Sequence, residues 1–247
     1  MTMRRWIADE VSGSRAALTG KHADHLVRVL RARIGQEFDI ATATGVRRGR
    51  VTSVSEDRVE FELGEEVGFA QGPRVTLLLA VFKFDRMEWA IEKCIELGVT
   101  HIVPVIGHRT DPRLASAAKK RVERWRRIAL QASEQSRRAA PPQILDPLKL
   151  KEAIDLDAEV RIVLSESEPQ DSIKHVLDAQ IEGKNRPPAG LSETSVGLAI
   201  GPEGGWTDHE LQLFRKNGWI SASLGKTILR SETAAIAALA IVVSALD

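Results

Sequence analysis

Two glycine-bearing runs near the C-terminus hold the residue types best suited to surround a small ligand. Residues 201–206 have the sequence Gly-Pro-Glu-Gly-Gly-Trp and follow the apolar stretch 196–200, and residues 224–234 follow the apolar stretch 219–224. Short apolar stretches of this kind are typical of buried strands. Ligands of open α/β sheets bind outside the carboxyl ends of strands, where glycine lets the backbone approach closely. The two runs therefore predict one shared pocket.

Neither run has the pattern of a phosphate-binding loop. Residues 225–227 (Gly-Lys-Thr) match the end of a Walker A loop, but Ile220 occupies the position of its first glycine. The alternative is that the glycines only end helices and turns, since residues 204–205 precede a capping box formed by Thr207 and Glu210. Two such loops within 34 residues, one with Pro-Glu between its glycines, favour a ligand site.

The elements that must position these runs fall into two parts. Up to about residue 70 the strand signals are short and separated by turn residues, at 37–41, 50–54 and 58–63, which indicates a small β-rich module. A Gln-Gly-Pro run at 71–73 marks the predicted boundary.

Strands and helices alternate beyond that boundary. The pattern predicts strands at 75–81, 99–106 and 160–164, a helix at about 86–97 and a long basic helix before Pro141. Such alternation is typical of an α/β fold with a mostly parallel sheet covered by helices. Residues 231–246 are apolar on nearly all sides, which predicts a buried helix.

Together these runs resemble the RsmE-type family of SPOUT methyltransferases, which methylate N3 of a uridine in 16S ribosomal RNA with S-adenosylmethionine (SAM). The resemblance covers nearly the whole chain. It extends in order through 87–89 (Met-Glu-Trp), 96–99 (Glu-Leu-Gly-Val), 102–104 (Ile-Val-Pro), 123–125 (Glu-Arg-Trp) and 132–136 (Ala-Ser-Glu-Gln-Ser), and through an N-terminal signature at 4–6, 25–26 and 29–31.

The resemblance implies the domain plan. Residues 1–71 correspond to a PUA-like RNA-binding domain, and residues 74–247 to a SPOUT methyltransferase domain with a C-terminal trefoil knot. Nothing in the pattern itself predicts a knot, because threaded chains are rare. The family also dimerises through the second domain, so a homodimer is expected.

Site roles follow from the same resemblance. Main-chain groups of the two runs would hold SAM, and the end of the strand at 160–164 would close a third side of the pocket. The expected cofactor-binding residues are Leu164, Ser165, Glu166, Ile200, Gly201, Pro202, Gly205, Leu224, Gly225, Ile228, Leu229 and Arg230.

Methylation of uridine N3 requires loss of the N3 proton, either to a general base or with cationic stabilisation of the anion. Arg230, Glu232 and Glu203 are the catalytic candidates by position. Arg230 could stabilise the anionic base, grip a phosphate, or form a structural ion pair with one of the glutamates. Either glutamate could take the proton or only cap a helix, so the identity of the base stays open.

Basic residues gather in two regions although the net charge is only +1. Residues 1–50 hold ten lysines or arginines against five acidic residues, and residues 109–138 hold ten against three. Such regions suit an RNA backbone, although a solvated helix face is the alternative for residues 119–127. The expected RNA-binding residues are Arg4, Arg5, His25, Arg28, Arg31, Lys83 and Arg86.

Composition narrows the remaining classes of function. The 247 residues, 43% of them hydrophobic, contain no 18-residue apolar run and no signal-peptide pattern, so a cytoplasmic location and no membrane contact are expected. Cys94 lies on the apolar stripe of the helix at 86–97 and is expected in the core. His22 and His25 form the only close histidine pair, and no cluster completes a metal site.

Two alternatives to a ribosomal RNA methyltransferase remain, a SPOUT enzyme acting on transfer RNA and a noncatalytic RNA-binding relative. Retention of both glycine loops disfavours the second of these. One departure from the family pattern is Phe84, which stands in the run 82–86 where a small residue is common. The shape of that loop is therefore not predicted from the family pattern.

Overall fold

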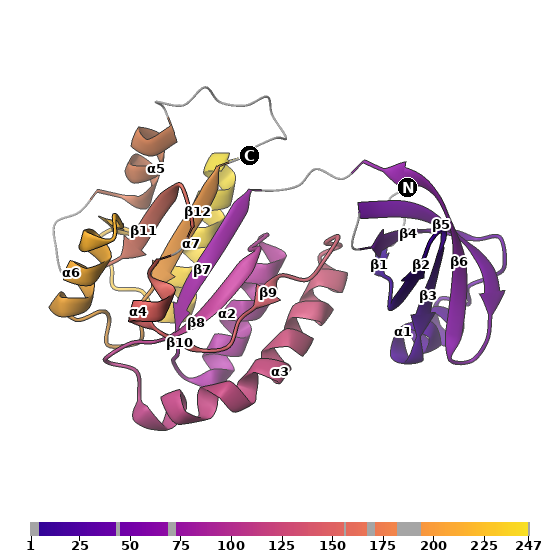
Figure 1. Ribbon diagram of the computed structural model, residues 1–247, viewed down its shortest axis with the longest axis horizontal. Helices are drawn as coiled ribbons and strands as arrows, with labels where there is room; N and C mark the ends of the chain where they lie inside the picture. The colour runs from indigo at the N-terminus through magenta and orange to yellow at the C-terminus, as the bar shows by residue number, and fades with distance from the viewer. Residues whose placement is uncertain are drawn as a thin grey trace. The chain divides into compact units, whose positions relative to one another are not determined.

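The computed structural model describes residues 5–42, 45–68, 73–155, 157–166, 171–181 and 194–246. The chain divides into two compact units (Figure 1). Unit 1 comprises Met1–Ala70 and Ser133–Pro141, and unit 2 comprises Gln71–Ala132 and Pro142–Asp247. The return of 133–141 to the N-terminal unit was not predicted. Arg4 and the expected boundary at 71–72 lie outside the described residues.

Unit 1 is a six-stranded sheet in the order β1-β4-β5-β6-β3-β2, with one parallel pair, β1 and β4. Its two edge strands, β1 and β2, are separated by only Ala8 and Asp9. The Ala8 amide donates to Ala41 of β4 (3.0 Å) and the Asp9 amide to Ala17 of β3 (3.1 Å), so the sheet curls until its edges meet. The strands are β1 (Arg5–Ile7), β2 (Glu10–Ser12), β3 (Arg15–Thr19), β4 (Glu37–Thr42), β5 (Gly45–Val54) and β6 (Arg58–Val67).

Two short helical turns, α1 (Gly20–Asp24) and the π-helical η1 (His25–Val29), connect β3 to β4. They place Leu26 in the core of the unit, where Phe38 and Phe61 pack edge to face with ring centroids 6.2 Å apart. Strands β4 to β6 confirm the three predicted strands of this module and extend all of them, β4 by one residue.

His22 lies between two carboxylates within unit 1. Its Nδ1 is 2.9 Å from Oδ1 of Asp9, and its Nε2 is 2.8 Å from Oε1 of Glu134. The hydrogen bond to Glu134, followed by that to Asp9, raises the pKa of His22 from 6.5 to about 9 despite partial burial. A protonated His22 therefore ties the segment 133–141 to the β-rich core.

The sheet of unit 2 is parallel throughout, in the order β10-β8-β7-β12-β11-β13, with β9 also paired to β8. Its strands are β7 (Arg74–Ala80), β8 (His101–Ile106), β9 (Gln143–Ile144), β10 (Leu148–Lys149), β11 (Val160–Leu164), β12 (Ser195–Ile200) and β13 (Ile220–Ala222). The predicted parallel α/β sheet is confirmed, and β11 has the predicted bounds.

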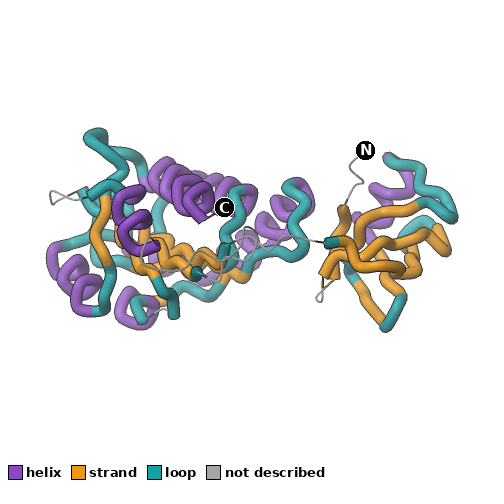
Figure 2. The backbone as a smooth tube through the Cα atoms, turned by 90° about the horizontal axis from the view of Figure 1, so that it is seen from above, coloured by secondary structure: helices purple, strands orange, loops and turns teal. Residues whose placement is uncertain are grey.

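Helices cover both faces of this sheet (Figure 2). Side chains of four helices join the larger core on one face, and those of two helices join the smaller core on the other. The first group is α2 (Phe84–Glu96), α3 (Pro112–Gln135), α5 (Ile173–Ile181) and α7 (Ser231–Leu246), and the second is α4 (Leu150–Ala153) and α6 (Asp208–Lys216).

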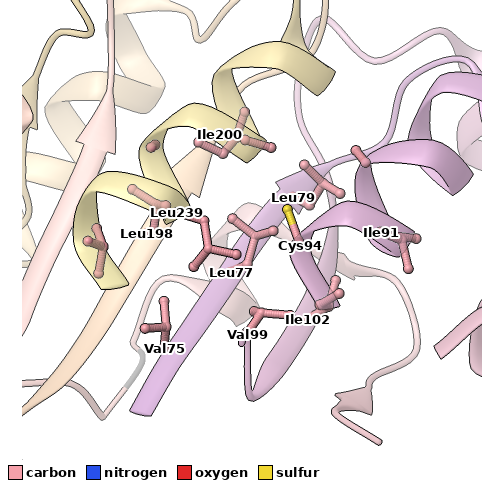
Figure 3. Close-up of a cluster of buried hydrophobic side chains, with 14 of the residues drawn as sticks. Val75, Leu77, Leu79, Ile91, Cys94, Val99, Ile102, Leu198, Ile200 and Leu239 are labelled. Atoms are coloured by element: carbon pink, nitrogen blue, oxygen red, sulfur yellow. The ribbon is translucent and has the colours of Figure 1, made fainter. Parts of the chain in front are cut away.

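The apolar helix α7 has the predicted bounds and packs on α2, α5 and β12. In Figure 3, Leu239 of α7 lies with Leu77 and Leu198 of the sheet. Cys94 is fully buried in the same cluster, and burial raises the pKa of its thiol to about 12. The prediction of a core cysteine is confirmed. Within the described ranges, no helix is both long and apolar enough to cross a membrane.

We predict that the His22 tie loosens at high pH. Because the folded pKa lies above the unfolded value, the stabilisation is complete below about pH 6.5 and is lost as the pH rises through about 9. Replacing His22 by Gln should lower the opening free energy of the segment 133–141 by about 1–2 kcal/mol at pH 6, since the pair is partly solvated, and by little at pH 10. Hydrogen exchange of that segment measures this difference.

His25→Gln is the matched control, because the exposed His25 forms no ion pair within the described residues. A His22→Gln effect of equal size at both pH values would contradict a role for the charge.

Candidate cofactor and catalytic site

The loop after β12 is a tight turn at the centre of the parallel sheet. The amide of Gly205 donates to the carbonyl of Pro202 (2.8 Å), and Gly205 has a φ of +69°, a left-handed conformation that favours glycine. Glu203, Gly204 and Gly205 are exposed, and neither glycine has a side chain of its own to cover the main chain of this turn.

Gly201 allows the turn to fold back on itself. A Cβ at this position would lie 3.3 Å from both the Gly205 Cα and the Trp206 Nε1. The indole of Trp206 is buried, packs edge to face on Phe214, and has no hydrogen-bond partner for Nε1 among the described residues. A side chain at this position would therefore crowd the turn and require its neighbours to shift.

The ends of the other central strands lie level with this turn. In the parallel register Val163 of β11 pairs with Ala199 of β12, and Leu164 pairs with Ala222 of β13. The amide of Ser165 donates to the carbonyl of Ala222 (3.1 Å). The three predicted segments, 164–166, 200–205 and 224–230, thus begin along one edge of the sheet.

The segment between β13 and α7 is open to solvent. Gly225, Ile228 and Arg230 are exposed, and Ile228 reaches 81% exposure, while Leu224 and Leu229 are half-buried. An isoleucine so exposed beside glycine turns provides an apolar surface for a flat ligand.

Arg86 of α2 lies between Glu203 and Glu232, the two glutamates among the catalytic candidates, and contacts both. Its Nη1 lies 3.0 Å from Oε1 of Glu203, and its Nε lies 3.8 Å from Oε1 of Glu232. Glu232 is only 5% exposed in the first turn of α7, and its Oε2 has no hydrogen-bond partner among the described residues. The structure thus brings a buried carboxylate with one free oxygen to the carboxyl edge.

Arg230 does not take part in this cluster. Its side chain is exposed and has no hydrogen bond or ion pair with any residue that the structure describes. The ion pair that the sequence suggested for Arg230 is made by Arg86, which was expected to bind RNA. Lys83, expected in the same role, is exposed immediately before α2.

Phe84 opens α2 and packs against α3. Its ring centroid lies 6.1 Å from that of Trp125 and 4.7 Å beneath the guanidinium of Arg121. Arg121 also approaches Glu88 of α2 (3.7 Å). The large residue is thus accommodated by contacts with α3.

The RNA-binding candidates of unit 1 lie on β1 (Arg5), on η1 (His25 and Arg28) and just after η1 (Arg31). His25 is exposed with its ring 5.6 Å from Trp6, Arg28 pairs with Asp24 (2.5 Å), and Arg31 is exposed with a φ of +51°. Nη1 of Arg5 donates to the carbonyl of Arg137 (2.6 Å).

A model of the RNA methyltransferase domain family matches residues 70–243. The chain belongs to this RNA methyltransferase family. It is 32% identical over 236 residues to ribosomal RNA small subunit methyltransferase E of Synechocystis, covering 94% of this chain and 74% of that protein. It is 30% identical over 231 residues to the Bacillus subtilis protein of the same name, covering 90% and 87% of the two chains.

Solved structures agree with this RNA methyltransferase assignment. The crystal structure of a ribosomal RNA small subunit methyltransferase E from Neisseria gonorrhoeae bound to SAM has a TM-score of 0.77 at 31% identity, covering 96% of this chain and 95% of that one. A Legionella pneumophila protein in complex with the bound cofactor SAM has a TM-score of 0.77 at 26% identity, covering 99% and 98%. The predicted family and its two-part α/β fold are confirmed.

The loop after β8 was missed by sequence reasoning in this RNA methyltransferase. Nη1 of Arg109 donates to the carbonyls of Gly204 (2.6 Å) and Trp206 (3.3 Å). The amide of His108 donates to Oε1 of Glu210 (2.7 Å), the residue predicted only as part of a capping box. Glycine at the end of β8 was the available signal, since Gly107 resembles the glycines that pointed to the other loops.

Within the described part of this family member, no group of three or more histidine, cysteine, aspartate or glutamate side chains could hold a metal ion. The residues at the carboxyl edge instead fit an organic cofactor. They offer exposed main-chain groups at Gly204 and Gly205, an apolar surface at Ile228, and unpaired polar atoms on Trp206 and Glu232.

We predict that Gly201→Val weakens SAM binding more than tenfold. The valine would push against the Gly205 backbone and the Trp206 indole, so the turn could not keep its shape. Isothermal titration measures the affinity. Gly68→Val is the matched control, because a Cβ at Gly68 meets nothing within 4 Å. Unchanged affinity in Gly201→Val would remove this turn from the cofactor site.

Proposed function

We propose that this chain transfers a methyl group from SAM to N3 of a uridine in 16S ribosomal RNA of the small subunit. The observation that carries the proposal is the SAM-bound relative from Neisseria gonorrhoeae, which matches this chain at 31% identity over 95% of its own length. The two glycine loops at one sheet edge supply a site for such a cofactor.

The cofactor-binding set is proposed from the three segments at that edge. Main-chain groups of Ile200, Gly201, Pro202 and Gly205 would bind the polar parts of SAM, and the apolar side chain of Ile228 would cover its base. The remaining members are Leu164, Ser165, Glu166, Leu224, Gly225, Leu229 and Arg230. SAM supplies a methyl group on a cationic sulfonium.

Glu232 is the proposed acceptor of the uridine N3 proton. Its Oε2 is buried and unpaired among the described residues, while the guanidinium of Arg86 lies 3.8 Å from its other oxygen, Oε1. Glu203 is the weaker candidate, because its side chain is 41% exposed and pairs directly with Arg86. Arg230 is unpaired among described residues, and is proposed to stabilise the negative charge that develops on the uracil.

RNA contacts are proposed on both units. In unit 1 they involve Arg5, His25, Arg28 and Arg31, and in unit 2 Lys83. A further stripe lies on α3, where Arg113, Lys120 and Arg127 recur every seven residues, about 10 Å apart on one helix face.

The α3 stripe differs from three other arginines of the helix in having no ion-pair partner among the described residues. Arg121, Arg124 and Arg126 all pair with carboxylates. The three side chains of the stripe form no ion pair with any described residue. Unpaired cations in a line suit a phosphate backbone.

The proposal also covers the oligomeric state, the cellular location and the knotted topology. A homodimer through unit 2 is supported by two exposed apolar side chains, Trp89 at 48% and Ile228 at 81%. The trefoil knot is carried over from the family. Action on 16S RNA within the small subunit and a cytoplasmic location are further parts of the proposal.

The test of function is methyl transfer from labelled SAM to purified small ribosomal subunits, naked 16S RNA and total transfer RNA. Nucleoside analysis should find 3-methyluridine in the ribosomal RNA only. Label in transfer RNA would move the substrate to that class, and absence of label despite SAM binding would overturn the proposed activity.

Two isosteric variants separate the candidate bases. Glu232→Gln should lower kcat by roughly 10²–10⁴-fold, the usual contribution of a positioned base, with SAM affinity unchanged. Glu203→Gln should lower kcat much less, because that carboxylate is exposed and already paired with Arg86 through Oε1. Equal losses in the two variants would argue that both act only by holding Arg86.

Neutralising the α3 stripe should weaken RNA binding and its salt dependence. Replacing Arg113, Lys120 and Arg127 by Gln should reduce the slope of log K against log salt by up to about 2, given roughly 0.7 per phosphate contact on a single strand. The control removes three exposed lysines of unit 2 elsewhere, Lys151, Lys174 and Lys216. Equal effects of the two triple variants would leave only a general charge effect.

A further inference from the structure

The turn after β12 is held from outside by the loop that follows β8. No cofactor-binding residue was expected from β8, which lies two strands away from β12 in the sheet, with β7 between them. The contacts join residues 107–110 to residues 204–210 through one arginine and one buried glutamate.

Arg109 fixes the main chain of the turn. Its Nη1 donates to the carbonyls of Gly204 (2.6 Å) and Trp206 (3.3 Å), which flank the left-handed Gly205. The approach depends on glycine, because a Cβ on Gly204 would lie 3.3 Å from Cδ of Arg109. Because the guanidinium of Arg109 binds the carbonyls on both sides of Gly205, it restricts rotation of the two peptide groups there.

Glu210 fixes the end of the turn from beneath. It is 6% exposed, and its Oε2 accepts hydrogen bonds from the amide and the hydroxyl of Thr207, each 2.8 Å long. Its Oε1 accepts from the amide of His108 (2.7 Å) in the β8 loop. The capping carboxylate of α6 therefore also holds a second loop, and both of its oxygens are used.

The β8 loop is itself braced. The amide of Gly107 donates to Oγ1 of Thr110 (3.1 Å). A Cβ on Gly107 would lie 3.2 Å from the Trp206 ring and 3.3 Å from Oε1 of Glu210, so a side chain here would separate the loops. The two loops thus form one preformed unit rather than two independent ones.

We propose that Arg109 and Glu210 are positioning residues for the SAM site, which hold the 201–206 turn in its binding conformation before the cofactor arrives. This inference rests on the proposed cofactor role of that turn. The turn depends on glycines, which lose much conformational freedom on ordering, so a turn without the brace would have to be ordered by the cofactor's own binding energy.

Arg109→Met tests the brace, since methionine keeps most of the aliphatic stem and removes the donors. The SAM dissociation constant and the KM for SAM should rise about tenfold or more, the usual effect of losing a charged hydrogen bond. At saturating SAM, kcat should stay within about threefold, because the bound cofactor then orders the turn. Arg74→Met is the matched control, an exposed arginine at the opposite end of β7.

Three further variants keep the inference testable if Arg109→Met folds poorly. Arg109→Lys retains a donor and should recover part of the affinity, and added guanidinium should restore binding in Arg109→Ala. Glu210→Gln should raise the KM for SAM without a matching loss of kcat. A loss of kcat at saturating SAM equal to the loss of affinity would overturn the positioning role.

Failure of the brace and failure of the proposed site are distinguishable. If Gly201→Val weakens SAM binding but Arg109→Met and Glu210→Gln do not, the turn binds SAM without needing the β8 loop, and the inference is wrong. If none of the three changes SAM affinity, the cofactor site itself lies elsewhere.

Discussion

Parallel pairing of the central strands is the constraint on which the site depends. Strands β7, β12, β11 and β13 all run in one direction and in matched register, so their carboxyl ends open at the same edge. Segments up to 66 residues apart, such as those after Leu164 and before Arg230, become neighbours of one turn for this reason. Helices on both faces bury the apolar strands and leave this edge for chemistry.

Charge at that edge is organised around a single cation. Arg86 holds the exposed Glu203 of one loop and the buried Glu232 of another, so the N-terminus of α2, the turn after β12 and the first turn of α7 meet at one guanidinium. Burying a carboxylate is costly unless it is paired, and the 3.8 Å ion pair of Glu232 with Arg86 is too long for a hydrogen bond. A buried carboxylate with an unpaired oxygen is consistent with a functional site, where such a group is kept available for the substrate.

The sequence predicted what depends on local pattern. Strands β11 and β12 and helix α7 were placed to within one residue, because continuous apolar runs mark elements buried on both sides. The short strands β1 and β9, of three and two residues, carry no readable period and were not predicted. The partners of Arg86 and Arg109 could not be found either. Glu203 is 117 residues from Arg86 and Gly204 is 95 from Arg109, so only the fold brings them together.

Helix α3 belongs to both units, because its last residues, from Ser133, fall within unit 1. The N-terminal unit is consequently discontinuous in sequence, and a fragment that stops near residue 70 lacks the Glu134 partner of His22. A recombination event that exchanged N-terminal modules at the linker alone would leave this piece behind. Because the chain leaves unit 1 and returns to it, an intact unit 1 cannot be exchanged without part of the chain that follows unit 2's first residues.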